Sequence, residues 1–168
     1  RVNQQRQRNG QLAYDGLDEP WATPLAEARL SAFLAADRDN NADGGPEAFL
    51  SGSIVDAQSR WNVRNLVAPD GKIQPAEMAA LRALVDLAGA PVDAAERIAA
   101  ALRDAWAPTV DAGSARARPV APARLSDLAW LGIEPETLAR LEPWVTLLPA
   151  RTPVNVNTAS REAIVAAI

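Results

Sequence analysis

The stretch at residues 52–67, with the sequence GSIVDAQSRWNVRNLV, constrains the fold most, because strand and turn chemistry occur together in it. Most of its apolar residues are β-branched or aromatic, and residues 61–64 alternate apolar with polar side chains, as strands do. Between the two apolar parts lie Asp56, Gln58 and Ser59, whose side chains can hydrogen-bond the backbone of a turn. The pattern predicts a short antiparallel pair of strands.

Two pairs of asparagines recur in the chain, Asn62 with Asn65 and Asn155 with Asn157. An amide side chain both donates and accepts hydrogen bonds, so it can pair loop backbone that would otherwise be buried without a partner. We expect these amides to brace loops, with ligand contact as the alternative. Thr158 follows the second pair, and its side chain suits the N-cap of a last helix.

The composition excludes several kinds of chemistry. The 168 residues suffice for one sizeable core or two small ones. The formal net charge is −4 and Lys72 is the only lysine, so the chain is a poor general partner for phosphate backbones or anionic membranes. It has no histidine and no cysteine, which excludes Ser-His and Cys-His nucleophilic sites, disulfides and almost any zinc site. We therefore predict that the chain is not an enzyme.

Two consecutive helices are predicted after residue 74, where the apolar period changes from two to three or four. Pro75 suits the first position of one helix, which Gly89 ends, and Pro91 opens the next. The expected apolar stripe of the second helix consists of Val92, Ala95, Ile98, Leu102 and Trp106. Such a stripe is typical of a helix packed against a core.

Two short helices are predicted in the C-terminal third of the chain. Ser126 or Asp127 can cap the first, and Pro135 can open the second. Trp130 and Trp144 are expected to anchor this region in the core, because large aromatic side chains contribute most when they are buried.

The segment at residues 37–46 contains a candidate calcium site. The spacing of Asp39, Asn41, Asp43 and Gly44 resembles the first half of a calcium loop, in which oxygen ligands alternate and a glycine permits a sharp turn. The second half does not follow, because Leu50 stands where such a loop needs a glutamate. A solvated hairpin loop without metal is the alternative.

Three separated motifs resemble one protein family. Residues 53–67 are similar to the signature of the minor pseudopilin K of bacterial type II secretion systems, which runs roughly as I-x-D-x-Q-x-R-F/Y-N-L-N-x-L. Residues 19–22 (EPWA) and 148–160 (LPARTPVNVNTAS) also match that family, in the same order. The polar positions that carry the central match are Asp56, Gln58, Arg60 and Asn62, whereas Asn65 lies one place after the second asparagine of the pattern.

This resemblance implies an α+β fold. Residues 1–73 would form part of a pilin-like domain, with a small antiparallel sheet that includes strands near residues 29–35 and 52–55. Residues 74–168 would form a larger helical domain inserted into that sheet, with SAM-like and helix-hairpin-helix-like character, and truncated at its C-terminal end. In many family members the region equivalent to residues 107–124 carries acidic segments associated with bound calcium, but none of those carboxylates is matched here.

The resemblance also implies a structural function. Members of this family sit at the tip of the periplasmic pseudopilus with the minor pseudopilins I and J, where they start assembly and limit fibre length. They are anchored in the inner membrane by an N-terminal helix, which would lie upstream of Arg1, since no apolar run in this chain is long enough to span a bilayer. The expected location of this chain is the periplasm of a Gram-negative bacterium.

A DNA-binding protein of the competence type is the alternative. The NVNTAS sequence at residues 155–160 also occurs in helix-hairpin-helix proteins of that type, where a glycine hairpin binds a DNA phosphate. The glycine segment at residues 131–133 lacks a Gly-x-Gly, and the net charge of −4 does not provide the basic footprint of such a site. We therefore expect no nucleic-acid partner.

Overall fold

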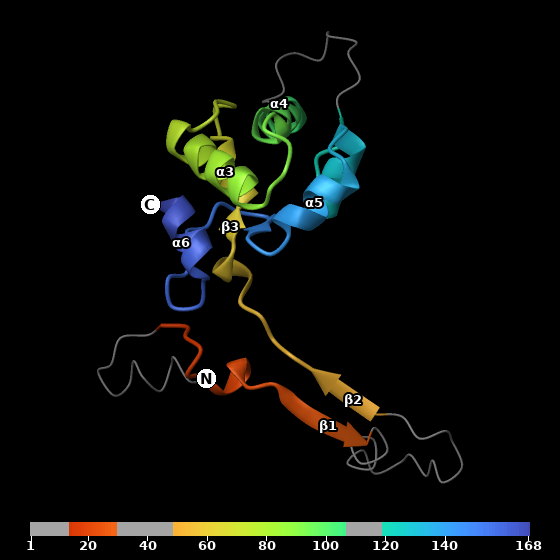
Figure 1. Ribbon diagram of the computed structural model, residues 1–168, viewed down its shortest axis with the longest axis vertical. Coiled ribbons are helices and arrows are strands. Elements are labelled where there is room, and N and C mark those ends of the chain that lie inside the picture. Colours follow the sequence, from red (N-terminus) through yellow and green to blue (C-terminus); the bar gives the residue numbers. More distant parts are fainter. Residues whose placement is uncertain (1–13, 30–48, 107–118) are drawn as a thin grey trace. The chain divides into compact units, whose positions relative to one another are not determined.

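A computed structural model describes residues 14–29, 49–106 and 119–168 of the chain (Figure 1). Two compact units are present, Arg1–Asp56 and Ala57–Ile168. The described part of the first unit contains a 3-10 helix, η1 (Pro20–Ala22), and two strands, β1 (Leu25–Arg29) and β2 (Phe49–Gly52). The second unit contains η2 (Ala57–Ser59), β3 (Trp61–Asn62), η3 (Val63–Leu66), α3 (Pro75–Leu87), α4 (Ala94–Trp106), η4 (Leu125–Leu131), α5 (Pro135–Leu141), β4 (Val145–Thr146) and α6 (Arg161–Ala167).

The first unit holds an antiparallel pair of strands. In this pair Leu25 of β1 lies opposite Gly52 of β2, and Arg29 lies opposite Phe49, with an irregularity in the register between them. The strand predicted near residues 52–55 is wrong in its position, because β2 ends at Gly52 and Ile54 is exposed outside it. Of the strand predicted at residues 29–35, only residue 29 lies within β1, and the rest lies outside the described residues.

In the second unit the strand pairing is parallel. Trp61 and Asn62 of β3 lie beside Val145 and Thr146 of β4. The antiparallel pair predicted within residues 52–67 is therefore wrong. Of the polar residues between its expected strands, Gln58 and Ser59 lie in the 3-10 helix η2. Strand β3 pairs with a strand about eighty positions further along the chain, a partner that local sequence periodicity does not encode.

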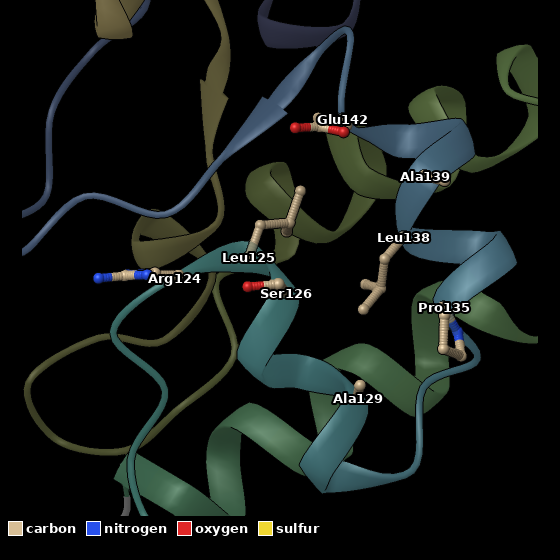
Figure 2. Close-up of a pocket in the computed structure, with 8 residues that line it drawn as sticks. All are labelled: Arg124, Leu125, Ser126, Ala129, Pro135, Leu138, Ala139 and Glu142. Carbon is tan, nitrogen blue, oxygen red and sulfur yellow. The ribbon is translucent and has the colours of Figure 1, made fainter.

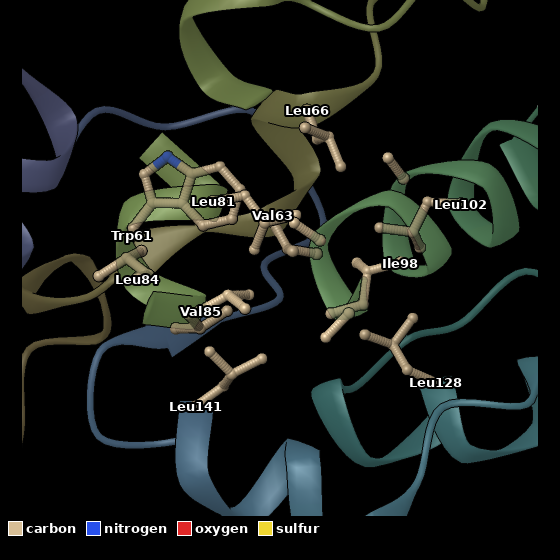
Figure 3. Close-up of a cluster of buried hydrophobic side chains, with 14 of the residues drawn as sticks. Trp61, Val63, Leu66, Leu81, Leu84, Val85, Ile98, Leu102, Leu128 and Leu141 are labelled. Atoms are coloured by element: carbon tan, nitrogen blue, oxygen red, sulfur yellow. The ribbon is translucent and has the colours of Figure 1, made fainter. Parts of the chain in front are cut away.

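The hydrophobic core of the second unit brings β3 and η3 against the helices (Figure 3). Helix α3 contacts α4, α6 and η3, and η4 contacts both α4 and α5. A central tryptophan, Trp61, is only 1% exposed. The other large, fully buried side chains of this core include Val63, Leu66, Leu81, Leu84, Ile98, Leu102, Leu128, Leu141 and Val145.

The predicted start of α3 at Pro75 is confirmed, and the helix is followed by Gly89 with a φ of 58°. A residue without a Cβ adopts this left-handed conformation at little cost, so the glycine allows the turn that directs the chain into α4. The start predicted for the second helix is wrong, because α4 begins at Ala94 and not at Pro91. Val92 therefore lies before the helix and is 92% exposed, while the rest of the predicted stripe is at least partly buried.

The two short helices of the C-terminal third are present, with different details. The first is the 3-10 helix η4, which begins at Leu125, so its cap is Arg124 and the caps predicted at Ser126 or Asp127 are wrong. The carboxylate of Asp127 instead accepts hydrogen bonds from the backbone N–H groups of Ala123 and Arg124. Pro135 does open α5, as predicted. Trp130, predicted to be an anchor, is 71% exposed on η4.

The division into packing units falls earlier in the sequence than the expected domain boundary. Residues 57–73 pack with the helices of the second unit, whereas the boundary expected from the family lies after residue 73. The boundaries of a compact packing unit need not coincide with those of an inserted domain, since the strand that flanks an insertion can pack against it. The domain boundary therefore stays a prediction.

Candidate functional site

The most constrained polar group of the second unit is the amide of Asn62, which is 1% exposed. Its nitrogen Nδ2 donates to the carbonyl of Ala150 at 2.8 Å and to Oγ1 of Thr152 at 2.9 Å. Its oxygen Oδ1 accepts from the backbone N–H of Arg64 at 3.0 Å and from that of Leu148 at 3.1 Å. Because a primary amide has two N–H donors and two acceptor lone pairs, its full hydrogen-bonding capacity is used.

Asn65 binds the same distant loop. Its Nδ2 donates to the carbonyl of Thr152 at 2.8 Å, and its Oδ1 accepts from the N–H of Thr152 at 3.1 Å. The side chain therefore pairs with the loop as a neighbouring strand would, although no strand is present there. We call Asn62, Asn65 and residues 148–152 the asparagine clasp.

Local structure places both amides on the same side of the chain. Asn62 is the N-cap of η3, and its bond to the N–H of Arg64 satisfies a donor that the start of a helix leaves free. One turn later, Asn65 follows on the 3-10 helix, where residues three apart eclipse each other. The N–H of Trp61 donates to the carbonyl of Trp144 at 2.8 Å, which places β4 and the loop after it within reach of both amides.

Asn155 and Asn157 lie close together, and the backbone of Asn155 also binds a residue far away in the sequence. The N–H of Asn155 donates to the carbonyl of Gln58 at 2.9 Å, while its Oδ1 accepts from the N–H of Asn157 at 3.1 Å. The N-cap predicted at Thr158 is wrong, because α6 begins at Arg161 and Ser160 accepts the capping hydrogen bond from the N–H of Ala163. The carbonyl of Asn155 instead turns the chain through Thr158 and the following residue.

Three other residues of the family motif, Asp56, Gln58 and Arg60, precede β3 in the chain. Asp56 is the last residue of the first unit, and Gln58 lies in η2, where its backbone carbonyl binds Asn155. Arg60 is half-buried directly before β3. The guanidinium of Arg64 lies over the ring of Trp106, 4.2 Å from its centre, which is a cation–π contact between η3 and the end of α4. Sequence reasoning missed this contact, since nothing in the spacing links an arginine to a tryptophan 42 positions away.

Arg97 of α4 joins this helix to the start of α5. Its Nη2 donates to the carbonyl of Gly132 at 2.7 Å and to Oε1 of Glu134 at 2.6 Å. The hydrogen bond from Arg97 lowers the pKa of Glu134 below its ordinary value, and the same bond raises the pKa of Arg97. An electrostatic bond of this kind orients two elements, and it lies at the surface, with the two side chains 34% and 53% exposed.

A groove of about 430 Å³ lies between η4 and α5 (Figure 2). Leu125 and Leu138 line it from the two helices, and Arg124 and Glu142 are the ionisable residues among those that line it. A single arginine and a single glutamate are not a pair of carboxylates or a nucleophile with its base. The groove therefore offers an apolar surface with no recognisable reaction centre.

The expected calcium ligands Asp39, Asn41 and Asp43 lie outside the described residues. Within residues 14–29, 49–106 and 119–168, no group of three histidine, cysteine, aspartate or glutamate residues could hold a metal ion. No helix in these same ranges has the length and apolar character needed to cross a membrane.

The arrangement at the clasp is chemically a brace, since its best-fixed groups already bind one another.

Comparison with known proteins agrees with the motifs. The family model described as "Type II secretion system (T2SS), protein K" matches residues 59–150, which is more than half of the chain. None of the curated proteins matches the chain. The matched segment runs from the residues just before β3, through α3, α4 and α5, to the middle of the clasp loop. It contains both amides and the three partners Arg64, Leu148 and Ala150 of Asn62, while Thr152 lies just beyond it. The chain belongs to the protein K family of the type II secretion system.

Proposed function

We propose that this chain is the soluble part of a minor pseudopilin that occupies the tip of the type II secretion pseudopilus, where it starts assembly and limits fibre length. Membership of the protein K family makes it a component of type II secretion. The observation that supports the tip position is the helical unit at residues 57–168, which a simple pilin sheet does not need. A subunit that carries such a bulk obstructs the addition of another above it, so it fits only at an end.

The role is structural and involves no catalysis. The best-fixed polar groups of the second unit, the amides of Asn62 and Asn65, hold a loop and not a substrate. The partners are the minor pseudopilins I and J of the same system. A helix upstream of Arg1 anchors the protein in the inner membrane, and the chain described here lies in the periplasm. The domain boundary after residue 73 and the SAM-like character of the helical part belong to the same proposal.

Calcium remains a separate proposal for the segment with Asp39, Asn41 and Asp43. Titration with calcium by calorimetry tests it, because carboxylate and amide oxygens are the ligands that this ion prefers. A triple change of these residues to alanine should abolish the heat if they are the ligands. Heat that persists in the triple variant would place the ion elsewhere.

The tip proposal is tested by reconstitution with the periplasmic domains of pseudopilins I and J from the same bacterium. We expect the three chains to co-elute from a sizing column as one complex with equal amounts of each, and the major pseudopilin domain to elute separately. In cells, loss of the protein should give fewer fibres of greater length. Separate elution of all three chains, together with unchanged fibre length, would contradict the proposal.

The DNA-binding alternative has no support from the family match or from the described structure. The glycine after η4, Gly132, has its carbonyl bound by Arg97, and the chain as a whole is acidic. Retention on immobilised duplex DNA at low salt checks it, because phosphate binding weakens steeply as salt is added. We expect no retention.

A further inference from the structure

A pocket of about 250 Å³ opens beside the clasp, between the start of α3 and the end of α6. Val154, Val156 and Ile164 contribute to its apolar wall. Two polar side chains, Glu77 of α3 and Asn65 of η3, also line it. We call this space the Glu77 pocket, in which a carboxylate and a buried amide meet an apolar wall.

One oxygen of the Glu77 carboxylate is fixed. Oε2 accepts a hydrogen bond of 2.7 Å from the indole Nε1 of Trp61, whose ring is buried in the core. Glu77 lies in the first turn of α3, where the helix dipole stabilises a negative charge. Among the described residues, no arginine or lysine forms an ion pair with this carboxylate. The pocket therefore contains a positioned negative charge whose second oxygen is available to a ligand.

Asn65 adds a second polar group with capacity to spare. It is 8% exposed, and its bonds to Thr152 use one N–H and one lone pair of the oxygen. A primary amide can form two bonds of each kind, so one donor and one acceptor remain. Asn62, by contrast, is fully used, which makes Asn65 the member of the clasp that can bind something else.

We propose that the Glu77 pocket binds a long cationic side chain, an arginine or a lysine, from a partner protein. The aliphatic stem of such a side chain packs against the apolar wall while its charged end reaches a polar group. A guanidinium or ammonium donates to the free carboxylate oxygen of Glu77 and to the oxygen of Asn65, in charge-assisted hydrogen bonds. A purely apolar ligand fits less well, because it would bury the second oxygen of the carboxylate without a hydrogen-bond partner.

The test follows the indole Nε1–H signal of Trp61 in a two-dimensional NMR spectrum, since that group binds Glu77 at the pocket. The signal is assigned with Trp61→Phe. The probes are the acetyl amides of arginine, lysine and norleucine, which share a backbone and an extended stem but differ in charge. We expect saturable shifts with arginine and lysine amides and none with the norleucine amide at the same concentrations.

The matched variants are Glu77→Gln and Glu162→Gln. The first keeps an oxygen for the Trp61 indole but removes the charge, and should weaken arginine binding about tenfold, as expected for one charge-assisted hydrogen bond. The second removes an exposed charge of α6 that does not line this pocket, and should leave the affinity unchanged. Equal shifts with the norleucine amide, or no shift with any probe on the wild-type chain, would overturn the proposal without any variant. Neither result bears on whether the protein occupies the pseudopilus tip.

Discussion

The asparagine clasp and the surface link between α4 and α5 join distant parts of the chain with hydrogen bonds of similar length. Asn62 reaches Ala150 over 2.8 Å, and Arg97 reaches Glu134 over 2.6 Å. The environments differ, since Asn62 is 1% exposed and the side chains of the charged pair are 34% and 53% exposed. Bond length alone therefore does not show which of the two links contributes more to stability.

The two links differ in whether water can replace the hydrogen bond once it is broken. When an exposed ion pair breaks, both partners bind water, so the net gain from the pair is small. When a buried amide is removed, its backbone partners stay out of contact with water and have no hydrogen-bond partner in its place. The neutral clasp should therefore stabilise the second unit more than the charged link does, although a full charge makes the stronger bond in isolation.

The largest effect is expected for Asn62→Ala. This change leaves up to four partners of a buried amide without their bond, and we expect it to lower the free energy of unfolding by about 3–5 kcal/mol. Urea denaturation followed by tryptophan fluorescence measures it. Asn157→Ala is the control. Because Asn157 is exposed, this change should lower the free energy of unfolding by much less than Asn62→Ala does. Equal losses for both variants would mean that burial does not set the value of these amides.

A smaller loss is expected for Asn65→Ala, which removes two bonds to the backbone of Thr152. We expect a decrease of about 2 kcal/mol in the free energy of unfolding, in the same denaturation experiment. Asn62 and Asn65 share Thr152, so the double variant should lose less than the sum of the two single losses. Strict additivity would show that the two amides hold the loop independently.

Much of the clasp could be predicted from sequence, because amide chemistry is local. A side chain that can both donate and accept, placed next to strand-forming residues, indicated loop bracing at Asn62 and Asn65. The identity of the braced loop could not be read, since its residues lie nearly ninety positions away. The parallel pairing of β3 with β4 was missed for the same reason, and a local antiparallel pair was predicted in its place.

Helix starts were predicted correctly from a proline at Pro75 and Pro135 but not at Pro91, since α4 begins only at Ala94. They were not predictable where two capping residues compete, as with Thr158 and Ser160, because both hydroxyls suit a cap and only the turn geometry selects one. Burial of Trp130 was also predicted wrongly. Amino-acid type indicates that a large aromatic side chain gains by burial, but it does not say which face of a short helix meets the core.

An intermediate effect is expected at the start of α6, where a partly buried hydrogen bond joins a side chain to the backbone. Ser160→Ala removes the hydroxyl that caps α6, and we expect a loss of about 1 kcal/mol in the free energy of unfolding, less than at either clasp residue. Thr158→Ala serves as the matched hydroxyl control and should cost less than Ser160→Ala. A larger loss at Thr158 would restore it as the cap that the sequence favoured. Thermal unfolding followed by circular dichroism distinguishes the two.

The smallest effect is expected for Glu134→Gln, which breaks the exposed pair with Arg97. The pKa of Glu134 is lowered in the folded protein by the Arg97 hydrogen bond, so the unfolded state binds its proton at higher pH than the folded state does. The contribution of the pair is therefore fully present at neutral pH and is lost as the pH falls through the lowered pKa. Denaturation of wild type and variant should differ slightly at neutral pH and converge at strongly acidic pH or in molar salt. Glu142→Gln removes the same charge next to α5 without breaking a described ion pair, and it should show no such convergence. If the difference in stability between wild type and Glu134→Gln persists at acidic pH and in molar salt, the stabilisation comes from packing and not from charge. The contrast with the clasp would then be lost, because the contribution of the clasp should not depend on salt.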